Sequence, residues 1–207
     1  IPPTMPPSNA APIRSATALA TDDPALHGFV WEGAAMAAVL LELAGLSTRT
    51  RVRQALVDPT HEYIHLLHVG VGWAMARWPL SISRFLTSLD PLLRMLVFDG
   101  HGFHAGYFGG GRTDSIKNPW GPGDHRRGPF DQGLGRSFWF VEGADPGRIA
   151  ATIDRFDVKR RNDLWSGVGL AAAYAGPAST DGIGDLRQRA GNEAAALAQG
   201  ATFAAKA

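Results

Sequence analysis

The sequence contains no cysteine among its 207 residues. This absence excludes a disulfide-stapled scaffold, a thiolate zinc site and a cysteine nucleophile. Net charge is also low, because 20 basic residues stand against 19 acidic ones, and no dense Lys/Arg stripe exists to bind a nucleic-acid backbone. No uninterrupted apolar run approaches the roughly 18 residues that a membrane span needs. We therefore expect neither a nucleic-acid partner nor a membrane partner.

Glycine, by contrast, is abundant, with 25 residues. A glycine inside a helix costs roughly 1 kcal/mol relative to alanine, so glycines within apolar segments point to close packing of a neighbouring backbone. Six such segments recur at steps of 39, 30, 33, 34 and 31 residues, and they are centred on Gly33, Gly72, Gly102, Gly135, Gly169 and Gly200. A period of about 33 residues is typical of helix-pair repeats. A chance pattern in a glycine- and alanine-rich chain is the alternative.

The fold class predicted from these patterns is all-α, with stacked helix pairs forming an α–α superhelix or solenoid. No apolar/polar alternation of convincing length predicts a strand. Asp145 and Pro146 form a typical helix start. We expect helices over residues 29–43, 49–57, 60–78, 83–98, 133–141, 146–156, 160–175 and 181–206.

The predicted domain organisation has two parts. Residues 1–26, with prolines at positions 2, 3, 6, 7 and 12, form a loosely ordered arm, and residues 27–207 form a single helical-repeat domain. A Gly/Pro-rich loop at 109–130 interrupts this domain and is either functional or disordered. The last helix has no glycine or proline stop, which indicates a fragment of a longer protein.

The candidate catalytic residues are Asp99, His101 and His104. Two histidines three residues apart share a helix face, and Asp99 could orient one imidazole for proton transfer. The alternative is a repeat helix whose polar residues merely face a groove. Candidate ligand-binding residues are mostly tryptophans near the repeated glycines, for which core packing is the first explanation: Trp31, His68, Trp73, Tyr107, Trp139 and Trp165.

A weaker motif is His61-Glu62-Tyr63-Ile64-His65, whose histidines could share a zinc ion on one helix face. The position three residues after His65 holds His68 in place of the glycine of the extended motif. No Glu follows about twenty residues on, where a helical third ligand would stand, and Asp99, His101 and His104 remain possible donors. Histidines that pack on a half-buried helix face are therefore the favoured interpretation, and we expect no cofactor, with zinc as a minor alternative.

Two charged clusters complete the candidates. The residues Arg160-Arg161-Asn162-Asp163 are interpreted as a helix-end cap with surface ion pairs, in preference to an anion site. Asp124-His125-Arg126-Arg127 lies in the Gly/Pro-rich loop and could close over a ligand, although solvated loop charge is the default interpretation.

Six motifs in order resemble the UnbL-like proteins, a domain of unknown function found in actinobacterial gene clusters that build enediynes. They lie at 28–37, 68–74, 89–94, 99–104, 130–137 and 163–171. The resemblance covers about residues 26–207 and implies a cytoplasmic role in making or tailoring an enediyne polyketide. It supplies no catalytic residues. The leading hypothesis is a protein that binds or processes a hydrophobic polyene intermediate in a helix-lined groove. The alternatives are a non-catalytic scaffold for the polyketide synthase or its product, and a zinc-dependent hydrolase.

Overall fold

The structure is a computed structural model, and it confirms the prediction of an all-α fold. All regular secondary structure within the described residues is helical. None of these helices combines the length and the apolar character needed to cross a lipid bilayer. The expected arm, apart from Leu26, lies outside the described residues. The residues that the structure describes are 26–45, 56, 63–78, 86–87, 89–109, 116–176 and 180–206.

The chain divides into two compact units, residues 1–94 and residues 95–207, which we call unit 1 and unit 2. Each is described by itself below. The expectation of one domain from residue 27 onward stays a prediction.

Unit 1 contains α2 (His27–Leu43) and α4 (Ile64–Arg77), which pack against each other. α2 ends as the sequence predicts, because Gly45 adopts a φ of 71° that favours glycine and its N–H bonds to the carbonyl of Glu42. The two helices approach closely at Gly70, where a Cβ would overlap the carbonyl oxygen of Glu32. A glycine of the predicted pattern therefore forms the contact between them.

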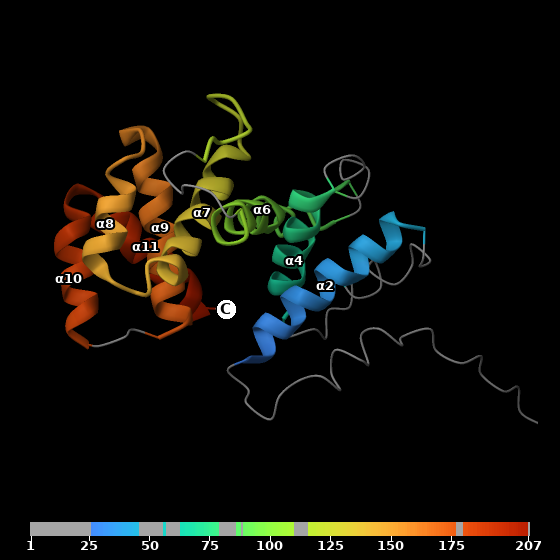
Figure 1. Cartoon of the computed structure of the whole chain (residues 1–207), viewed down its shortest axis with the longest axis horizontal. Coiled ribbons are helices and arrows are strands. Elements are labelled where there is room, and N and C mark those ends of the chain that lie inside the picture. The colour runs from blue at the N-terminus through green and yellow to red at the C-terminus, as the bar shows by residue number, and fades with distance from the viewer. Residues whose placement is uncertain are drawn as a thin grey trace, which may run out of the picture. The chain divides into compact units, whose positions relative to one another are not determined.

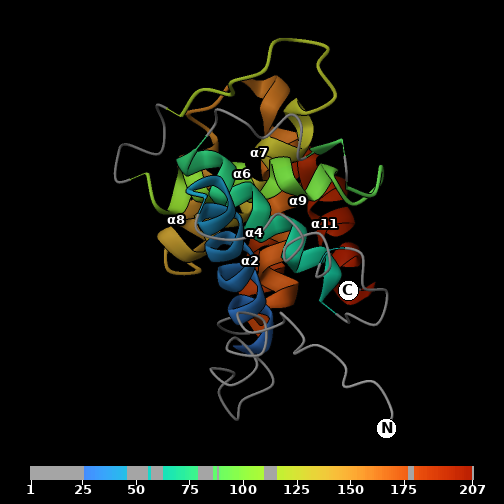
Figure 2. The same ribbon diagram turned by 90° about the vertical axis from the view of Figure 1, so that its right-hand side faces the viewer.

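Unit 2 contains a row of four helices in which successive members pack together (Figures 1 and 2). Two shorter helices, α8 and α10, pack on each other (Figure 1). The row consists of α6 (Met95–Tyr107), α7 (Arg127–Val141), α9 (Val158–Tyr174) and α11 (Ala194–Lys206). The other elements are α8 (Pro146–Ile153), α10 (Thr180–Ala190) and the 3-10 turn η3 (Gly191–Glu193).

The hydrophobic core of unit 2 lies between α7, α9 and the two shorter helices α8 and α10. Its largest side chains with almost no exposed surface come from α7, α8, α9 and α10: Phe130, Leu134, Phe138, Ile149, Ile153, Leu164 and Leu186. Burying a side chain of this size stabilises the fold by about 1.5–3 kcal/mol. The core therefore fixes the positions of α7 and α9, on which the polar contacts described below depend.

The paired glycines of α7 face its two neighbours in the row. A Cβ on Gly133 would overlap the carbonyl oxygen of Asp99 in α6, and a Cβ on Gly135 would overlap that of Leu164 in α9. Residues two apart lie on nearly opposite sides of a helix. Each Gly-x-Gly pair thus lets two helices approach from opposite sides, with the glycine Cα against a carbonyl oxygen, as in weak C–H···O contacts.

The same contact recurs along the row. In α9, Gly167 faces the carbonyl of Gln132 in α7, and Gly169 faces that of Leu197 in α11. The first glycine of each pair faces the preceding helix and the second faces the following one. This is repeat-like packing, while the sequence repeat of about 33 residues remains a prediction.

Several helix boundaries differ from the expected ones. Residues 89–94, inside the helix expected over 83–98, form a turn instead, because the Asp90 carboxylate accepts hydrogen bonds from the backbone N–H groups of Leu92 and Leu93. α6 begins after this turn, at Met95, and continues to Tyr107. α7 begins at Arg127, earlier than the expected residue 133. The start of α8 is confirmed, since the Asp145 side chain caps it by accepting from the N–H of Arg148.

Candidate ligand site

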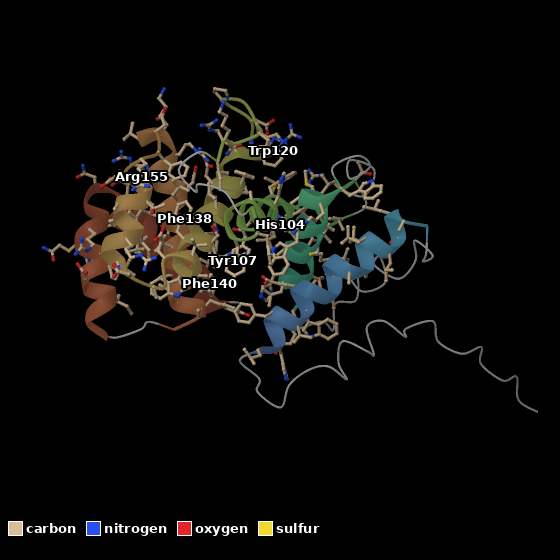
Figure 3. The ribbon with its side chains drawn as sticks, in the orientation of Figure 1. His104, Tyr107, Trp120, Phe138, Phe140 and Arg155 are labelled. Carbon is tan, nitrogen blue, oxygen red and sulfur yellow. The ribbon has the colours of Figure 1, made fainter. Side chains whose placement is uncertain are left out.

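α6 carries the three candidate catalytic residues and Tyr107. His104 and Tyr107 are labelled on this helix in Figure 3. His101 and His104 are three residues apart and share a face, whereas Asp99 lies two residues before His101 and so points to nearly the opposite side. The structure therefore brings the two histidines together on one face. The Asp99 side chain lies on nearly the opposite side of α6 and does not join them.

Asp99 forms a buried ion pair with Arg136 of α7, with 2.8 Å between Oδ1 and Nη2. Its other oxygen, Oδ2, is buried and has no hydrogen-bond partner among the described residues. Burial raises the pKa of Asp99, and the neighbouring Arg136 opposes this rise in part. The guanidinium of Arg136 also lies over the ring of Phe103, 4.5 Å from its centroid.

His101 lies among aromatic rings. Its imidazole contacts Trp120 edge-on at a centroid distance of 5.5 Å and Phe130 at 5.3 Å. Burial, and after it the proximity of His104, lowers the pKa of His101 to about 4. The ring is therefore neutral at pH 7, and its buried Nδ1 has no hydrogen-bond partner among the described residues.

A continuous series of ring contacts extends from His104 to the end of α6. His104 packs against Phe108 at 5.0 Å, Phe108 contacts Tyr107 edge-on at 4.9 Å, and Tyr107 stacks on Phe103 at 5.4 Å. Phe140 of α7 contacts both Tyr107 and Phe103. Phe98, His101, Trp120 and Phe130 form a second group of rings in mutual contact. We call the two groups together the aromatic belt: Phe98, His101, Phe103, His104, Tyr107, Phe108, Trp120, Phe130 and Phe140.

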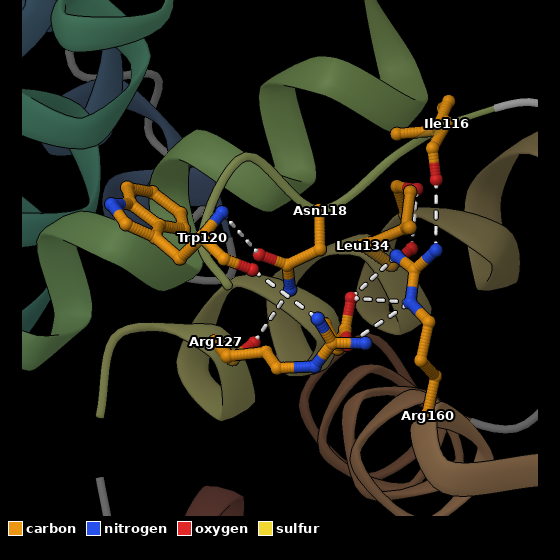
Figure 4. A network of polar contacts seen from close by, with 8 residues as sticks. Ile116, Asn118, Trp120, Arg127, Leu134 and Arg160 are labelled. Carbon is orange, nitrogen blue, oxygen red and sulfur yellow. Dashed lines mark hydrogen bonds and ion pairs between the residues drawn. The ribbon is translucent and has the colours of Figure 1, made fainter. Parts of the chain in front are cut away.

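The segment 116–126 brings Trp120 to this belt. The Asn118 side chain donates to the carbonyl of Arg127 at 2.9 Å and accepts from the N–H of Trp120 at 3.1 Å (Figure 4). Arg127 in turn donates to the carbonyl of Trp120 at 3.2 Å. Arg126, held by Asp124, lies over the Trp120 ring at 5.5 Å. The second half of the Gly/Pro-rich loop is therefore an ordered structure held by side chains.

Arg160 lies in a buried ion pair, so its expected place in a surface pair is wrong. Its guanidinium donates to both carboxylate oxygens of Asp131 in α7, at distances from 2.5 to 3.1 Å, and also to the carbonyl of Ile116 at 2.9 Å (Figure 4). The close packing of α7 and α9 buries both partners. Arg161, in contrast, forms the expected exposed pair with Asp154. Burial and the charge of Asp131 raise the pKa of Asp163, against the effect of Arg127.

The family model described as "Protein of unknown function (DUF1702)" covers residues 8–207. The chain belongs to the DUF1702 family. No curated protein and no solved structure matches it. The match agrees with the domain of unknown function expected from the sequence motifs.

The remaining candidate ligand residues of this DUF1702 chain lie in two other places. Trp139 and Trp165 are buried in the core of unit 2, where packing accounts for both rings. Trp31 lies on α2, and Trp73 and His68 lie on α4, all in unit 1. Their role in ligand binding stays a prediction.

His68 is fully buried, and its Nδ1 lies 2.8 Å from the carbonyl oxygen of Ile64. Burial lowers its pKa, so a neutral ring that bonds within its own helix accounts for it. His65 also has a pKa lowered by burial and by His68. His61 and Glu62 lie outside the described residues, so the zinc motif stays a prediction. Within the part of the chain that is described, no three His, Asp or Glu side chains cluster as metal ligands would.

Sequence reasoning missed several members of the belt. Phe103 and Phe108 stand four residues from Tyr107 and His104, and this spacing could have indicated ring contacts on one helix. Trp120 and Phe140 reach the belt from a loop and from α7. No local signal predicts contacts of that kind.

Proposed function

We propose that the protein binds a hydrophobic polyene or polyketide intermediate of enediyne biosynthesis along the aromatic belt, in the cytoplasm. The sequence motifs support the pathway, since they resemble proteins of enediyne gene clusters. The belt supports the binding, and the observation that carries the proposal is the continuous series of ring contacts from His104 to Phe140, which includes two half-exposed rings. Tyr107 is 47% exposed and Phe108 is 44% exposed.

Such a surface suits a flat, conjugated ligand. Aromatic rings associate in offset or edge-on arrangements, and each ring adds about 0.5–1.5 kcal/mol beyond the apolar area that it buries. The belt follows α6 through rings that already prefer these arrangements with each other. A polyene that lies along Tyr107 and Phe108 would bury exposed apolar surface without breaking any hydrogen bond.

The two imidazoles in the belt are the candidates for processing the ligand. His101 is neutral at pH 7 because of its lowered pKa, and it can accept or donate one hydrogen bond. His104 lies beside it on the same face. Asp99 pairs with Arg136 and points away from the two imidazoles, so it would have no direct contact with the reacting group.

The test is a fluorescence titration with parinaric acid, a conjugated tetraene, as the probe. Truncating two exposed rings in the double variant Tyr107→Ala/Phe108→Ala should weaken binding by about tenfold to a hundredfold. The matched control is Phe203→Ala, because Phe203 is 53% exposed on α11, outside the belt. Equal affinity in the double variant and in the control would overturn the proposal.

A second candidate function is a non-catalytic helical scaffold for the polyketide synthase or its product. The reciprocal glycine contacts favour it, since they hold α6, α7, α9 and α11 at a short fixed spacing that suits a rigid platform. Co-purification with the synthase in a fixed ratio, undiminished in the double variant His101→Ala/His104→Ala, would favour the scaffold. Loss of pathway product in that double variant, with co-purification intact, would favour ligand processing.

A further inference from the structure

The Trp120 indole covers His101 with a loop side chain. It contacts the imidazole, Phe98 and Phe130 edge-on, at centroid distances of 5.5, 5.2 and 5.4 Å. Phe98 and His101 come from α6 and Phe130 comes from α7, so three rings fixed by helices surround one ring that no helix holds. Trp120 is thus the one member of this group that can leave without unfolding a helix.

The His101 imidazole beneath the indole is polar, and one of its nitrogen atoms lacks a hydrogen-bond partner among the described residues. That atom is the buried Nδ1. A buried polar atom without a partner costs free energy, and such atoms often mark a place where a ligand or water binds. An imidazole in contact with two aromatic rings offers one polar contact in an otherwise apolar setting, as small-molecule sites commonly do.

The segment that carries Trp120 is held by a few side-chain contacts. Its anchors are the hydrogen bonds of Asn118 and Arg127, and the donation from Arg160 to the carbonyl of Ile116. Gly123, at the outer turn, has a φ of 83°, a conformation that favours glycine. Breaking these side-chain bonds frees Trp120 and leaves the backbone hydrogen bonds of α6 and α7 intact.

We propose that Trp120 covers a ligand subsite at His101 and that segment 116–126 is its lid. When the lid opens, the flat unsaturated part of the ligand takes the place of the indole against Phe98 and Phe130. A hydroxyl or carbonyl group of that ligand then hydrogen-bonds to the imidazole of His101. The ligand class rests on the proposed function, whereas the lid rests only on the contacts of Trp120.

The lid is tested without any ligand, by the rate at which diethyl pyrocarbonate modifies His101, measured by peptide mass spectrometry at pH 7. Trp120→Ala should raise this rate by about tenfold or more, and Asn118→Ala should raise it less, because the anchor is weakened but the ring remains. His125, with 72% of its side chain exposed, is the internal reference, and its rate should stay unchanged. Circular dichroism checks that both variants are folded. A His101 rate that stays at the wild-type value in both variants overturns the lid.

The subsite is tested with two probes, diphenylhexatriene and its para-hydroxymethyl derivative, by fluorescence titration. The wild-type protein should bind the hydroxymethyl probe about threefold to tenfold more tightly, the value of one added hydrogen bond. His101→Phe should abolish this preference, because phenylalanine keeps a ring at this position and has no polar atom. A preference that persists in His101→Phe overturns the role of His101.

The outcomes separate this inference from the proposed function. If neither probe nor parinaric acid binds, the proposed function and the ligand class both fail, and the modification rates alone decide whether Trp120 is a lid. If both probes bind equally to the wild-type protein, the belt binds polyenes but His101 contributes no polar contact, which overturns the subsite.

Discussion

Two neighbouring helix interfaces of unit 2 each contain a buried Asp–Arg ion pair beside an aromatic ring. They differ in whether both carboxylate oxygens have hydrogen-bond partners. Between α7 and α9, Arg160 forms three hydrogen bonds with the Asp131 carboxylate and lies over the ring of Phe156 at 4.8 Å. Between α6 and α7, Arg136 pairs with Asp99 and lies over Phe103. In this second pair, Asp99 keeps one buried oxygen without a partner among the described residues.

The difference shows which interface supports the fold and which lies beside the candidate site. A buried charge pair is costly to form and is tolerated when every atom is satisfied, as at Asp131. The incomplete pair at Asp99 adjoins Phe103, a ring of the aromatic belt. The ion pair between α7 and α9 is thus fully hydrogen-bonded. The ion pair between α6 and α7, beside the belt, leaves one carboxylate oxygen without a partner among the described residues.

Breaking the complete pair should have the largest effect on stability. Arg160→Met removes the cation and leaves Asp131 buried without its partner, which we expect to lower the free energy of unfolding by about 3–5 kcal/mol. Urea unfolding at pH 7, followed by circular dichroism, measures the loss. The control is Arg148→Met, since Arg148 forms an exposed pair with Glu142 that is worth about 0–1 kcal/mol. Equal losses in the two variants would contradict the structural role of the buried pair.

The glycine contacts, which both interfaces share, should give the next largest effect. Gly133→Ala and Gly167→Ala each place a methyl group on a neighbouring backbone carbonyl, and we expect each to lower the free energy of unfolding by about 1–3 kcal/mol. Gly184→Ala in α10 is the control, because no atom lies near its added Cβ, and alanine should stabilise that helix by about 0.5–1 kcal/mol. A destabilising effect at Gly184 as large as at Gly133 would mean that helix spacing is not the cause.

The sequence predicted the fold better than the site. Glycines inside apolar segments predicted close helix packing, and Gly135 and Gly169, two of the six central glycines, have the contacts that this requires. The Asp145 cap was predictable because its signal is local. The buried ion pair of Arg160 was not predictable, because its partner Asp131 stands 29 residues earlier, on another helix. The same applies to Trp120, whose ring reaches His101 from a loop without periodicity.

The incomplete pair at Asp99 should give the smallest effect and the most informative dependence on pH. Asp99→Asn removes the charge but keeps an acceptor near Arg136, and we expect it to cost about 1 kcal/mol at pH 7. Asp131→Asn should cost more, because it weakens a pair with three hydrogen bonds.

The direction of the pH dependence follows from the raised pKa of Asp99. A carboxyl whose folded pKa is raised holds its proton more tightly in the folded state than in the unfolded state. Its contribution to stability is therefore lost as pH rises from its usual pKa through the raised one, by about 1.4 kcal/mol per unit of pKa rise. The Asp99→Asn variant has no carboxyl to titrate, so its stability does not fall in this way. The difference in free energy of unfolding between wild type and variant should therefore shrink between pH 4 and pH 7, measured by urea unfolding. A cost that grows with pH would mean that the attraction of Arg136 outweighs burial and that Asp99 is as well satisfied as Asp131.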